Sequence, residues 1–184
     1  MKHKIIYENL GCKLLQPHQH HDSRGFFCEL LNDSLENFLN FKPVQENSSF
    51  SHKNVIRGLH IQYKPHTSKL IRVTSGRILD VAVDCRPFSK TFGNHVMVEL
   101  SSETTNMFYI PEGFAHGFLS LEDKTVVNYY VNQIYNPSGE LSINAFSKSL
   151  SIDWKLNPCD ESVIMSEKDK LAIDFEKVLW KQFY

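Results

Sequence analysis

The segment GRILDVAVDCR, residues 76–86, alternates strictly between two sets of side chains. One set is Ile78, Asp80, Ala82 and Asp84, and the other is Leu79, Val81, Val83 and Cys85. A period of two predicts a half-buried β-strand, because successive side chains of a strand point to opposite faces. Since two aspartates share one face, we expect that face to line a polar cavity.

Other short apolar runs separated by turn residues favour further strands. They cover residues 69–74, 95–100, 106–110, 118–121 and 125–131. Strands at such spacing predict an all-β sandwich or barrel. The chain has 184 residues, so we expect one domain over residues 1–184.

Helices are expected in two places only. Residues 33–41 fit a short helix capped by Asp33 or Ser34, with Leu35, Phe38 and Leu39 facing inward. Ser166 opens an S-x-x-D capping pattern, which is followed at helical spacing by the apolar residues Leu171, Phe175, Val178 and Leu179.

Charge and composition exclude several classes of protein. The net charge of -1 without a basic stripe argues against a nucleic-acid partner. No apolar run reaches the ~20 residues of a membrane span, and the first residues lack a signal-peptide core, so we expect a cytoplasmic protein. The four cysteines form no C-x-x-C pair, and we expect free structural thiols at Cys12, Cys28, Cys85 and Cys159.

Histidines are the first candidates for chemistry. His18, His20 and His21 are close enough in sequence to hold a metal, but they lie between Pro17 and Gly25, where a solvated turn is the simpler interpretation. His116 lies in IPEGFAHGF, whose P-x-G-x-x-H resembles the second metal motif of cupin barrels.

The first cupin metal motif, H-x-H followed by Glu, is incomplete in this chain. His60 is present, but Gln62 stands at the second histidine, and His66 or Thr67 stands where the glutamate belongs. Two of the four expected ligands are therefore missing, and we expect no metal. A metal-free histidine inside a cavity is available as a base. Arg57 reaches the same side as His60 only if Gly58 bends the strand.

Nine segments in order along the chain resemble one family, the nucleotide-diphospho-4-keto-6-deoxysugar 3,5-epimerases, typified by dTDP-4-dehydrorhamnose 3,5-epimerase. The segments are DSRGFFCEL, VQENSS, NVIRGLHIQ, SKLIRV, GRILDVAVDCR, TFGNHV, IPEGFAHGF, YNPSGE and SEKD. The resemblance implies a cupin-type jelly-roll barrel with short flanking helices. It also implies a homodimer in which the N-terminal strands of one subunit complete the barrel of the other.

The resemblance also implies roles for individual residues. His60 matches the catalytic base, Asp169 its carboxylate partner, Lys69 the lysine beside the substrate carbonyl, and Tyr129 the proton donor. Arg57 matches a diphosphate ligand. The positions that contact nucleotide or sugar in the family are Arg24, Glu29, Gln45, Asn47, His116, Glu140 and Lys168. Taken alone, Lys69 also fits a surface lysine and Asp169 a simple helix cap.

These residue types suit epimerisation beside a ketone. The C4 carbonyl acidifies the hydrogens on C3 and C5, and an imidazole, with an ordinary pKa of ~6.5, removes one near neutral pH. Lysine stabilises the enolate, and a phenol on the opposite face returns a proton. No redox change occurs, so no cofactor is expected, and the product would feed surface polysaccharide synthesis.

Three departures from the family pattern leave the substrate open. Ser48 replaces a common histidine, residues 145–147 replace a Trp-Asn-Asp run, and the loop over residues 64–68 differs. The nucleotide is dTDP or GDP, the sugar a hexose or heptose, and the inverted carbon C3, C5 or both. Rival functions are a 3,4-ketoisomerase, a non-catalytic sugar-nucleotide-binding cupin and a metal-dependent oxygenase.

Overall fold

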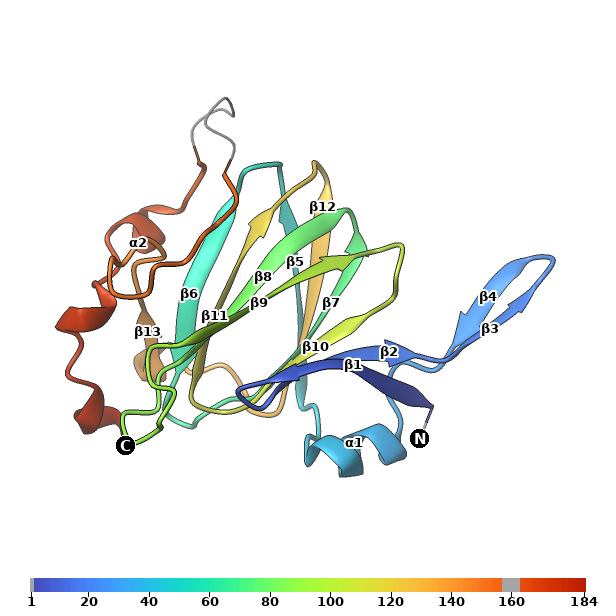
Figure 1. The fold of residues 1–184 in the computed structure, drawn as a ribbon, viewed down its shortest axis with the longest axis horizontal. Helices are drawn as coiled ribbons and strands as arrows, with labels where there is room; N and C mark the ends of the chain where they lie inside the picture. Colours follow the sequence, from blue (N-terminus) through green and yellow to red (C-terminus); the bar gives the residue numbers. More distant parts are fainter. Residues whose placement is uncertain (1, 157–162) are drawn as a thin grey trace.

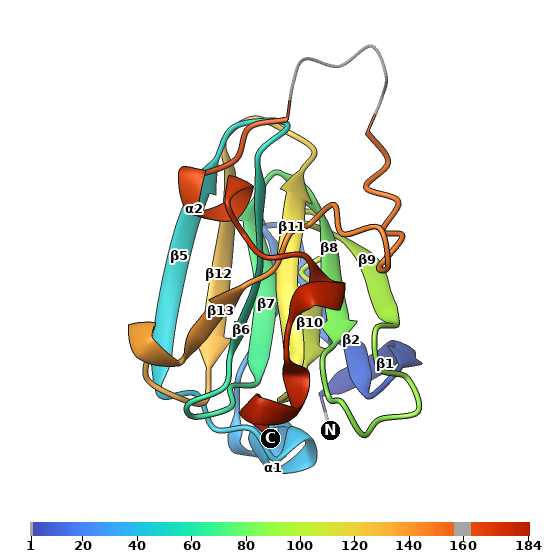
Figure 2. The same ribbon diagram turned by 90° about the vertical axis from the view of Figure 1, so that its left-hand side faces the viewer.

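The computed structural model describes residues 2–156 and 163–184 and consists of two antiparallel sheets facing each other (Figures 1 and 2). The first sheet runs in spatial order β1 (His3–Asn9), β2 (Cys12–Pro17), β10 (Met107–Ile110), β7 (Lys69–Ser75), β12 (Thr125–Val131) and β5 (Gln45–Ser51). The second runs β13 (Glu140–Ser142), β6 (Ile56–Gln62), β11 (Phe114–Ser120), β8 (Arg77–Asp84) and β9 (His95–Ser101). This two-sheet sandwich confirms the predicted all-β, cupin-type fold.

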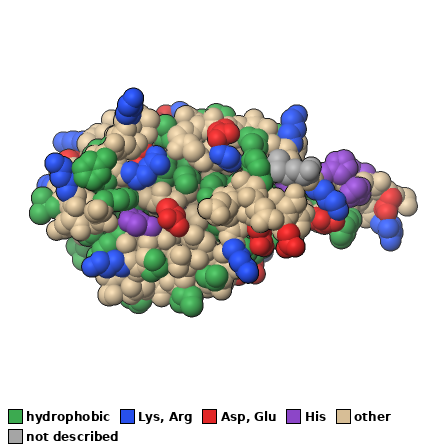
Figure 3. Space-filling view, turned by 90° about the horizontal axis from the view of Figure 1, so that it is seen from below, with side chains coloured by type: hydrophobic (Ala, Val, Ile, Leu, Met, Phe, Trp, Pro, Cys, Tyr) green, Lys and Arg blue, Asp and Glu red, His purple; other side chains and the backbone are tan. Residues whose placement is uncertain are grey.

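A small hairpin extends from this body. Its strands are β3 (Gln19–Asp22) and β4 (Gly25–Cys28), and they pair only with each other. Figure 1 shows the hairpin projecting away from the sandwich, and Figure 3 shows histidine side chains gathered on it. The expected turn at His20 and His21 is thus part of an exposed strand.

The second sheet is covered on both faces, so the prediction of a half-buried strand over residues 76–86 is wrong. On the inner face, Ile78 and Ala82 pack with Phe108 and Phe114 between the sheets. On the outer face, Val81 and Val83 pack against the C-terminal segment, including Trp154, Phe175 and Trp180. Every residue from Asp80 to Asp84 is buried as a result.

The aspartates of β8 do not line a polar cavity as expected. Asp80 and Asp84 have no exposed surface. Asp84 accepts hydrogen bonds from Arg86, Ser89 and Thr91, which satisfy the carboxylate inside the protein. Asp80 contacts His116 instead, as described below.

The N-terminal helix forms where it was expected, over α1 (Asp33–Leu39). Its N-cap is Asn32, one residue before the predicted caps, and the Asn32 side chain accepts from the Leu35 amide. Leu35 and Leu39 pack onto the outer face of the first sheet. Phe38, predicted to face inward, is 44% exposed.

The predicted C-terminal helix is wrong beyond its first turn. The Ser166 cap forms, but α2 (Glu167–Lys170) is followed by two 3₁₀ turns, Phe175–Lys177 and Trp180–Phe183. Phe175 and Val178 are buried, whereas Leu171 and Leu179 are exposed. The segment wraps the outer face of the second sheet, and the tertiary contacts of its aromatic residues override the helical spacing.

Smaller predictions are settled by the same structure. Strand β11 begins at Phe114, four residues before the expected start, and a further 3₁₀ turn covers Pro137–Gly139. Cys12, Cys28 and Cys85 are free thiols, and Cys159 lies outside the described residues. Within the described ranges, no helix is both long and apolar enough to cross a membrane.

Candidate active site

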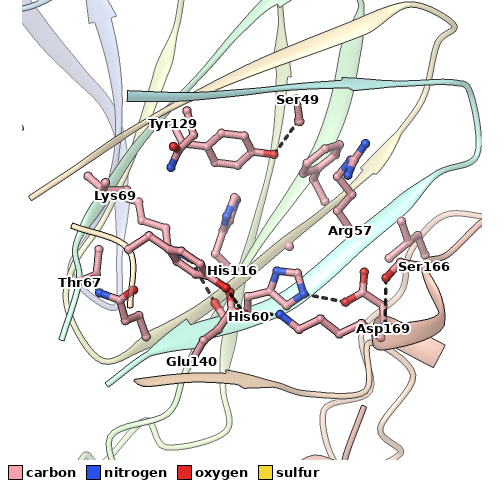
Figure 4. A pocket seen from close by; sticks show the side chains of 18 of the residues that line it. Ser49, Arg57, His60, Thr67, Lys69, His116, Tyr129, Glu140, Ser166 and Asp169 are labelled. Atoms are coloured by element: carbon pink, nitrogen blue, oxygen red, sulfur yellow. Dashed lines mark hydrogen bonds and ion pairs between the residues drawn. The ribbon is translucent and has the colours of Figure 1, made fainter. Parts of the chain in front are cut away.

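A pocket of about 630 Å³ opens between the two sheets and is bounded on one side by α2 (Figure 4). Strands β5, β7 and β12 of the first sheet and β6, β11 and β13 of the second contribute lining side chains. Its volume is in the range of small-molecule sites. Of the residues predicted for the site, it brings together His60, Lys69, Tyr129, Asp169, Asn47, Arg57, His116, Glu140 and Lys168.

His60 enters the pocket from β6 because the strand is distorted at Gly58. Gly58 has a φ of +102°, and the pairing of β6 with β11 shifts register at this point. A Cβ at Gly58 would lie 2.6 Å from the His116 carbonyl oxygen, so only glycine fits there. Arg57 and His60 both line the pocket, as the predicted bend requires.

Asp169 is the hydrogen-bond partner of His60. Its Oδ1 lies 2.6 Å from His60 Nε2. The carboxylate is 4% exposed, while the His60 side chain is 30% exposed. Because a carboxylate accepts, the proton lies on Nε2, and Nδ1 carries the free lone pair. Nδ1 is therefore the nitrogen of His60 that can accept a proton.

Helix α2 holds Asp169 in place. Ser166 caps the helix by accepting from the Asp169 amide at 3.1 Å. Burial raises the pKa of the Asp169 carboxyl. The hydrogen bond from His60 and the charge of His60 lower that pKa by more, so it lies below its usual range. The carboxylate is therefore ionised at neutral pH and stabilises a protonated His60.

Lys69 lies at the start of β7, and its Nζ donates to the His60 carbonyl oxygen at 3.2 Å. Desolvation in the pocket lowers its pKa to about 8, although the charges of Glu140 and Asp80 act in the opposite direction. Its ammonium is charged at neutral pH and lies beside the backbone of His60. A charge in that position stabilises an oxyanion formed in the pocket.

Tyr129 enters the pocket from β12, on the opposite sheet from His60 (Figure 4). Its hydroxyl lies 2.9 Å from Ser49 Oγ. Desolvation raises the pKa of the phenol, which is therefore protonated at neutral pH. The neighbouring Tyr130 packs on the outer face with Leu35 and Met107, so only one of the two tyrosines faces the cavity.

A second histidine–carboxylate pair lies deeper in the sandwich. His116 Nε2 is 2.5 Å from Asp80 Oδ1, and both residues are buried. Desolvation lowers the pKa of His116 despite the nearby Asp80 charge. The His116 ring contacts the Tyr129 ring edge-on, with centroids 6.0 Å apart.

Charged groups that line the pocket are held by neighbouring side chains. Arg57 donates from Nε to Ser51 Oγ at 3.0 Å. Glu140 accepts from Lys168 and, at 3.2 Å, from the Tyr135 hydroxyl. Gln45 does not line the pocket itself, but it donates to Asn47, which does.

Two predicted residues lie outside this pocket. Arg24 sits in the β3–β4 turn and pairs with Asp22, and Glu29 follows β4 and pairs with Lys2. The structure of one chain therefore does not bring Arg24 or Glu29 to the other site residues. Among residues 2–156 and 163–184, no group of three or more His, Cys, Asp or Glu is arranged to hold a metal ion, and this includes His18, His20 and His21.

Several residues that line the pocket or contact its lining were missed by the sequence analysis. Ser49 and Ser51 alternate within VQENSSFS, a signal that one strand face carries hydroxyls. Asp80 was expected to face a polar cavity, and its contact with His116 beside the pocket was missed. Tyr135 was visible only as the first residue of YNPSGE, and its contact with Glu140 depends on the fold of the loop.

Comparison with known proteins points to one family. A family model described as dTDP-4-dehydrorhamnose 3,5-epimerase matches residues 8–177. The enzyme of that name from Methanothermobacter thermautotrophicus is 43% identical over 162 residues, 87% of each chain. Its namesake from Escherichia coli is 39% identical over 170 residues, 90% of each chain.

A solved structure agrees with these relatives. It is the dTDP-6-deoxy-D-glucose-3,5-epimerase of Legionella pneumophila in complex with dTDP-4-keto-L-rhamnose. It superposes with a TM-score of 0.89 at 39% identity, over 96% of this chain and 94% of that one.

Proposed function

The chain belongs to the dTDP-4-dehydrorhamnose 3,5-epimerase family, and we propose that His60 and Tyr129 carry out the family reaction from opposite walls of the pocket. The protein is an isomerase that acts on a dTDP-linked 4-keto-6-deoxysugar in deoxysugar synthesis. The observation that carries the assignment of roles is the pairing of His60 with the buried Asp169, across the pocket from a protonated phenol.

In this mechanism, His60 Nδ1 removes the hydrogen from a carbon next to the C4 ketone. The electron pair of the broken C–H bond moves into an enolate, whose oxygen is stabilised by the Lys69 ammonium. Asp169 stabilises the imidazolium formed on His60. Tyr129 then donates its proton to the carbon from the other face, which inverts the centre. Once His60 has released its proton to solvent and Tyr129 has regained one, the same steps at the second carbon complete a 3,5-epimerisation.

The remaining predicted residues bind the nucleotide sugar. Arg57, held by Ser51, supplies a cation for the diphosphate. Asn47, His116, Glu140 and Lys168 line the pocket and contact the sugar or nucleotide, and Gln45 supports Asn47. The dTDP-sugar in the Legionella complex supports dTDP as the nucleotide. Residues 1–184 act as one domain, since the pocket needs both sheets, and cytoplasmic location stays a prediction.

Arg24 and Glu29 act in the neighbouring subunit of a homodimer. Their position on and beside a hairpin that projects from the body supports this part of the proposal (Figure 1). Such a hairpin pairs only with itself, and Phe26 and Phe27 on it are 48% and 66% exposed, which leaves apolar surface for a second copy to cover.

The function is tested by incubating the protein in deuterated water with a dTDP-linked 4-keto-6-deoxyhexose and following C3 and C5 by NMR. We expect deuterium at both carbons and inversion at both. The GDP-linked sugar serves as the matched comparison and is expected to react much more slowly. If neither C3 nor C5 exchanges with either nucleotide sugar, the proposal is rejected. A product whose carbonyl has moved from C4 to C3 identifies a 3,4-ketoisomerase instead.

A further inference from the structure

Strand β5 carries two serine hydroxyls that contact residues lining the pocket, and one of them, Ser49, lines the pocket itself. Side chains two residues apart on a strand share a face, so Ser49 and Ser51 point the same way. Ser51 Oγ accepts from Arg57, and Ser49 Oγ lies 2.9 Å from the Tyr129 hydroxyl. Each hydroxyl therefore contacts a side chain proposed to act on the substrate: Ser51 contacts Arg57, and Ser49 contacts Tyr129.

The register of the sheet fixes the second contact. Strand β5 pairs with β12 so that Asn47 lies opposite Tyr129 and Ser49 opposite Val127. Ser49 is thus the diagonal neighbour of Tyr129, at a distance that a long side chain reaches across the strands. Among the described residues, Ser49 is the hydrogen-bond partner of the Tyr129 hydroxyl.

Proton donation by Tyr129 fixes the direction of its hydrogen bond with Ser49. A phenol has one proton, and in the reaction that proton goes to carbon. Ser49 must then be the donor, because the phenolate left behind can only accept. The pocket desolvates Tyr129 and the Asp80 carboxylate on β8 disfavours its anion. Of the groups that face Tyr129, the Ser49 hydroxyl on β5 and the Arg57 charge on β6 favour that anion.

We propose that Ser49 is a positioning residue for the proton donor: its hydroxyl aims Tyr129 into the pocket and donates a hydrogen bond to the phenolate that follows protonation of the substrate. The inference rests on the proposed role of Tyr129. It assigns Ser49 to the second half of each inversion, the delivery of a proton, and not to its removal by His60.

Removal of a proton by His60 and delivery of a proton by Tyr129 can be measured separately. His60 is 30% exposed, so the proton it takes exchanges with solvent. When delivery from Tyr129 is slow, His60 returns a deuteron to the face from which it took the proton. The substrate then gains deuterium without inversion. A defect in Ser49 should therefore raise the ratio of exchange to inversion.

The experiment compares Ser49→Ala with wild-type protein in deuterated water on the dTDP-linked 4-keto-6-deoxyhexose. We expect inversion to slow roughly 10- to 100-fold, the effect of losing a hydrogen bond to a charged group. Exchange should fall less than inversion, and KM should change about twofold at most. Ser49→Thr, which keeps the hydroxyl, should retain the wild-type ratio.

Two further variants set the scale. Tyr129→Phe should exchange without inverting, which marks the limit of a lost proton donor. Ser101→Ala removes a half-buried serine at the end of the other sheet's edge strand β9 and should behave as wild type. Binding of dTDP to each variant, measured by calorimetry, reports that the pocket is folded.

The outcomes separate this inference from the function on which it rests. If wild-type protein and Tyr129→Phe behave as expected but Ser49→Ala keeps the wild-type ratio, only the inference on Ser49 is overturned. Equal losses of exchange and inversion in Ser49→Ala also overturn it, because they indicate a structural role. If wild-type protein neither exchanges nor inverts, the proposed function fails and the inference falls with it.

Discussion

At the scale of single residues, the site depends on which nitrogen of His60 is free. The 2.6 Å contact between Asp169 Oδ1 and Nε2 leaves the lone pair on Nδ1. Ser166 and the last short helix fix that carboxylate, so the state of the base is set by a contact across 109 residues of chain. A change of tautomer at this position would disable the base without moving any ring.

Asp169→Asn tests this directly. The amide nitrogen of asparagine can donate to Nε2, which moves the imidazole proton to Nδ1 and blocks the base. We expect kcat to fall by about 10²- to 10⁴-fold with dTDP binding unchanged. Asp174→Asn, a change of the same kind at a half-buried residue four positions beyond α2, should keep normal activity. Unchanged kcat in Asp169→Asn would show that Asp169 does not orient the base.

The pKa of Lys69 predicts a pH dependence. Desolvation lowers that pKa to about 8, so the ammonium is present below pH 8 and lost above it. We therefore expect kcat/KM to decrease above about pH 8, tenfold per pH unit, as the enolate loses its cation. The pKa of Tyr129 is raised above its ordinary value, so the phenol does not titrate in this window. A profile that stays flat to pH 10 would contradict the role of Lys69.

Part of the site could be read from the residues and part could not. Gly58, two residues before His60, already indicated a bend in the strand that brings Arg57 and His60 to one side. Asp169, by contrast, is far from His60 in sequence and was assigned by resemblance alone. Ser49 and Asp80 went unassigned, because a hydrogen-bond partner on another strand depends on register, which no local pattern specifies.

At the scale of elements, the distortion of β6 brings Arg57 and His60 to one pocket. Gly58 has a positive φ, and its Cα faces the backbone of β11, with the His116 oxygen and Gly117 Cα both within 2.8 Å of an added Cβ. The two strands that carry His60 and His116 are thus packed together through a residue without a side chain. This contact links the backbone geometry of β6 to the position of both imidazoles.

Gly58→Ala should therefore cost stability as well as activity. We expect the free energy of unfolding to fall by about 3 kcal/mol or more, from backbone strain plus the steric clash. Gly25→Ala is the matched control, since Gly25 has a φ of +128° but no atom within 4 Å of the added Cβ. Its cost should be about 1–2 kcal/mol, from strain alone. Denaturant unfolding compares the two, and equal losses would rule out the clash.

Two elements, β12 and the C-terminal segment, show where a sequence pattern predicts secondary structure correctly and where it does not. Strand β12 (Thr125–Val131) matches its prediction residue for residue, because its run of β-branched and aromatic residues agrees with its place in the sheet. The apolar residues of the C-terminal segment have helical spacing. Phe175 and Trp180 nevertheless pack on Val83 and its neighbours, and the segment forms 3₁₀ turns instead of a continuous helix. The local spacing of apolar residues predicts secondary structure only where tertiary packing favours the same secondary structure.

At the scale of the whole molecule, one chain brings His60, Tyr129 and Lys69 into a single pocket, while Arg24 and Glu29 lie elsewhere. If the hairpin serves a second subunit, sites can be assembled from two inactive chains. The test is to unfold and refold Arg24→Ala together with His60→Ala in equal amounts. Random pairing should restore about a quarter of wild-type activity, since half of the dimers carry one intact site. No recovery above the separate variants would place Arg24 in its own chain's site or outside any site.

Removal of the proton from the sugar carbon by His60 can be followed as deuterium uptake at C3 and C5. The measurement uses NMR on the dTDP-linked 4-keto-6-deoxyhexose and compares the His60→Ala variant with wild-type protein. His52→Ala, which removes an exposed histidine paired with Asp123, is the control. We predict that the His52 variant exchanges at the wild-type rate and that the His60 variant, still binding dTDP, exchanges at neither carbon. Exchange at the wild-type rate in His60→Ala would contradict the account.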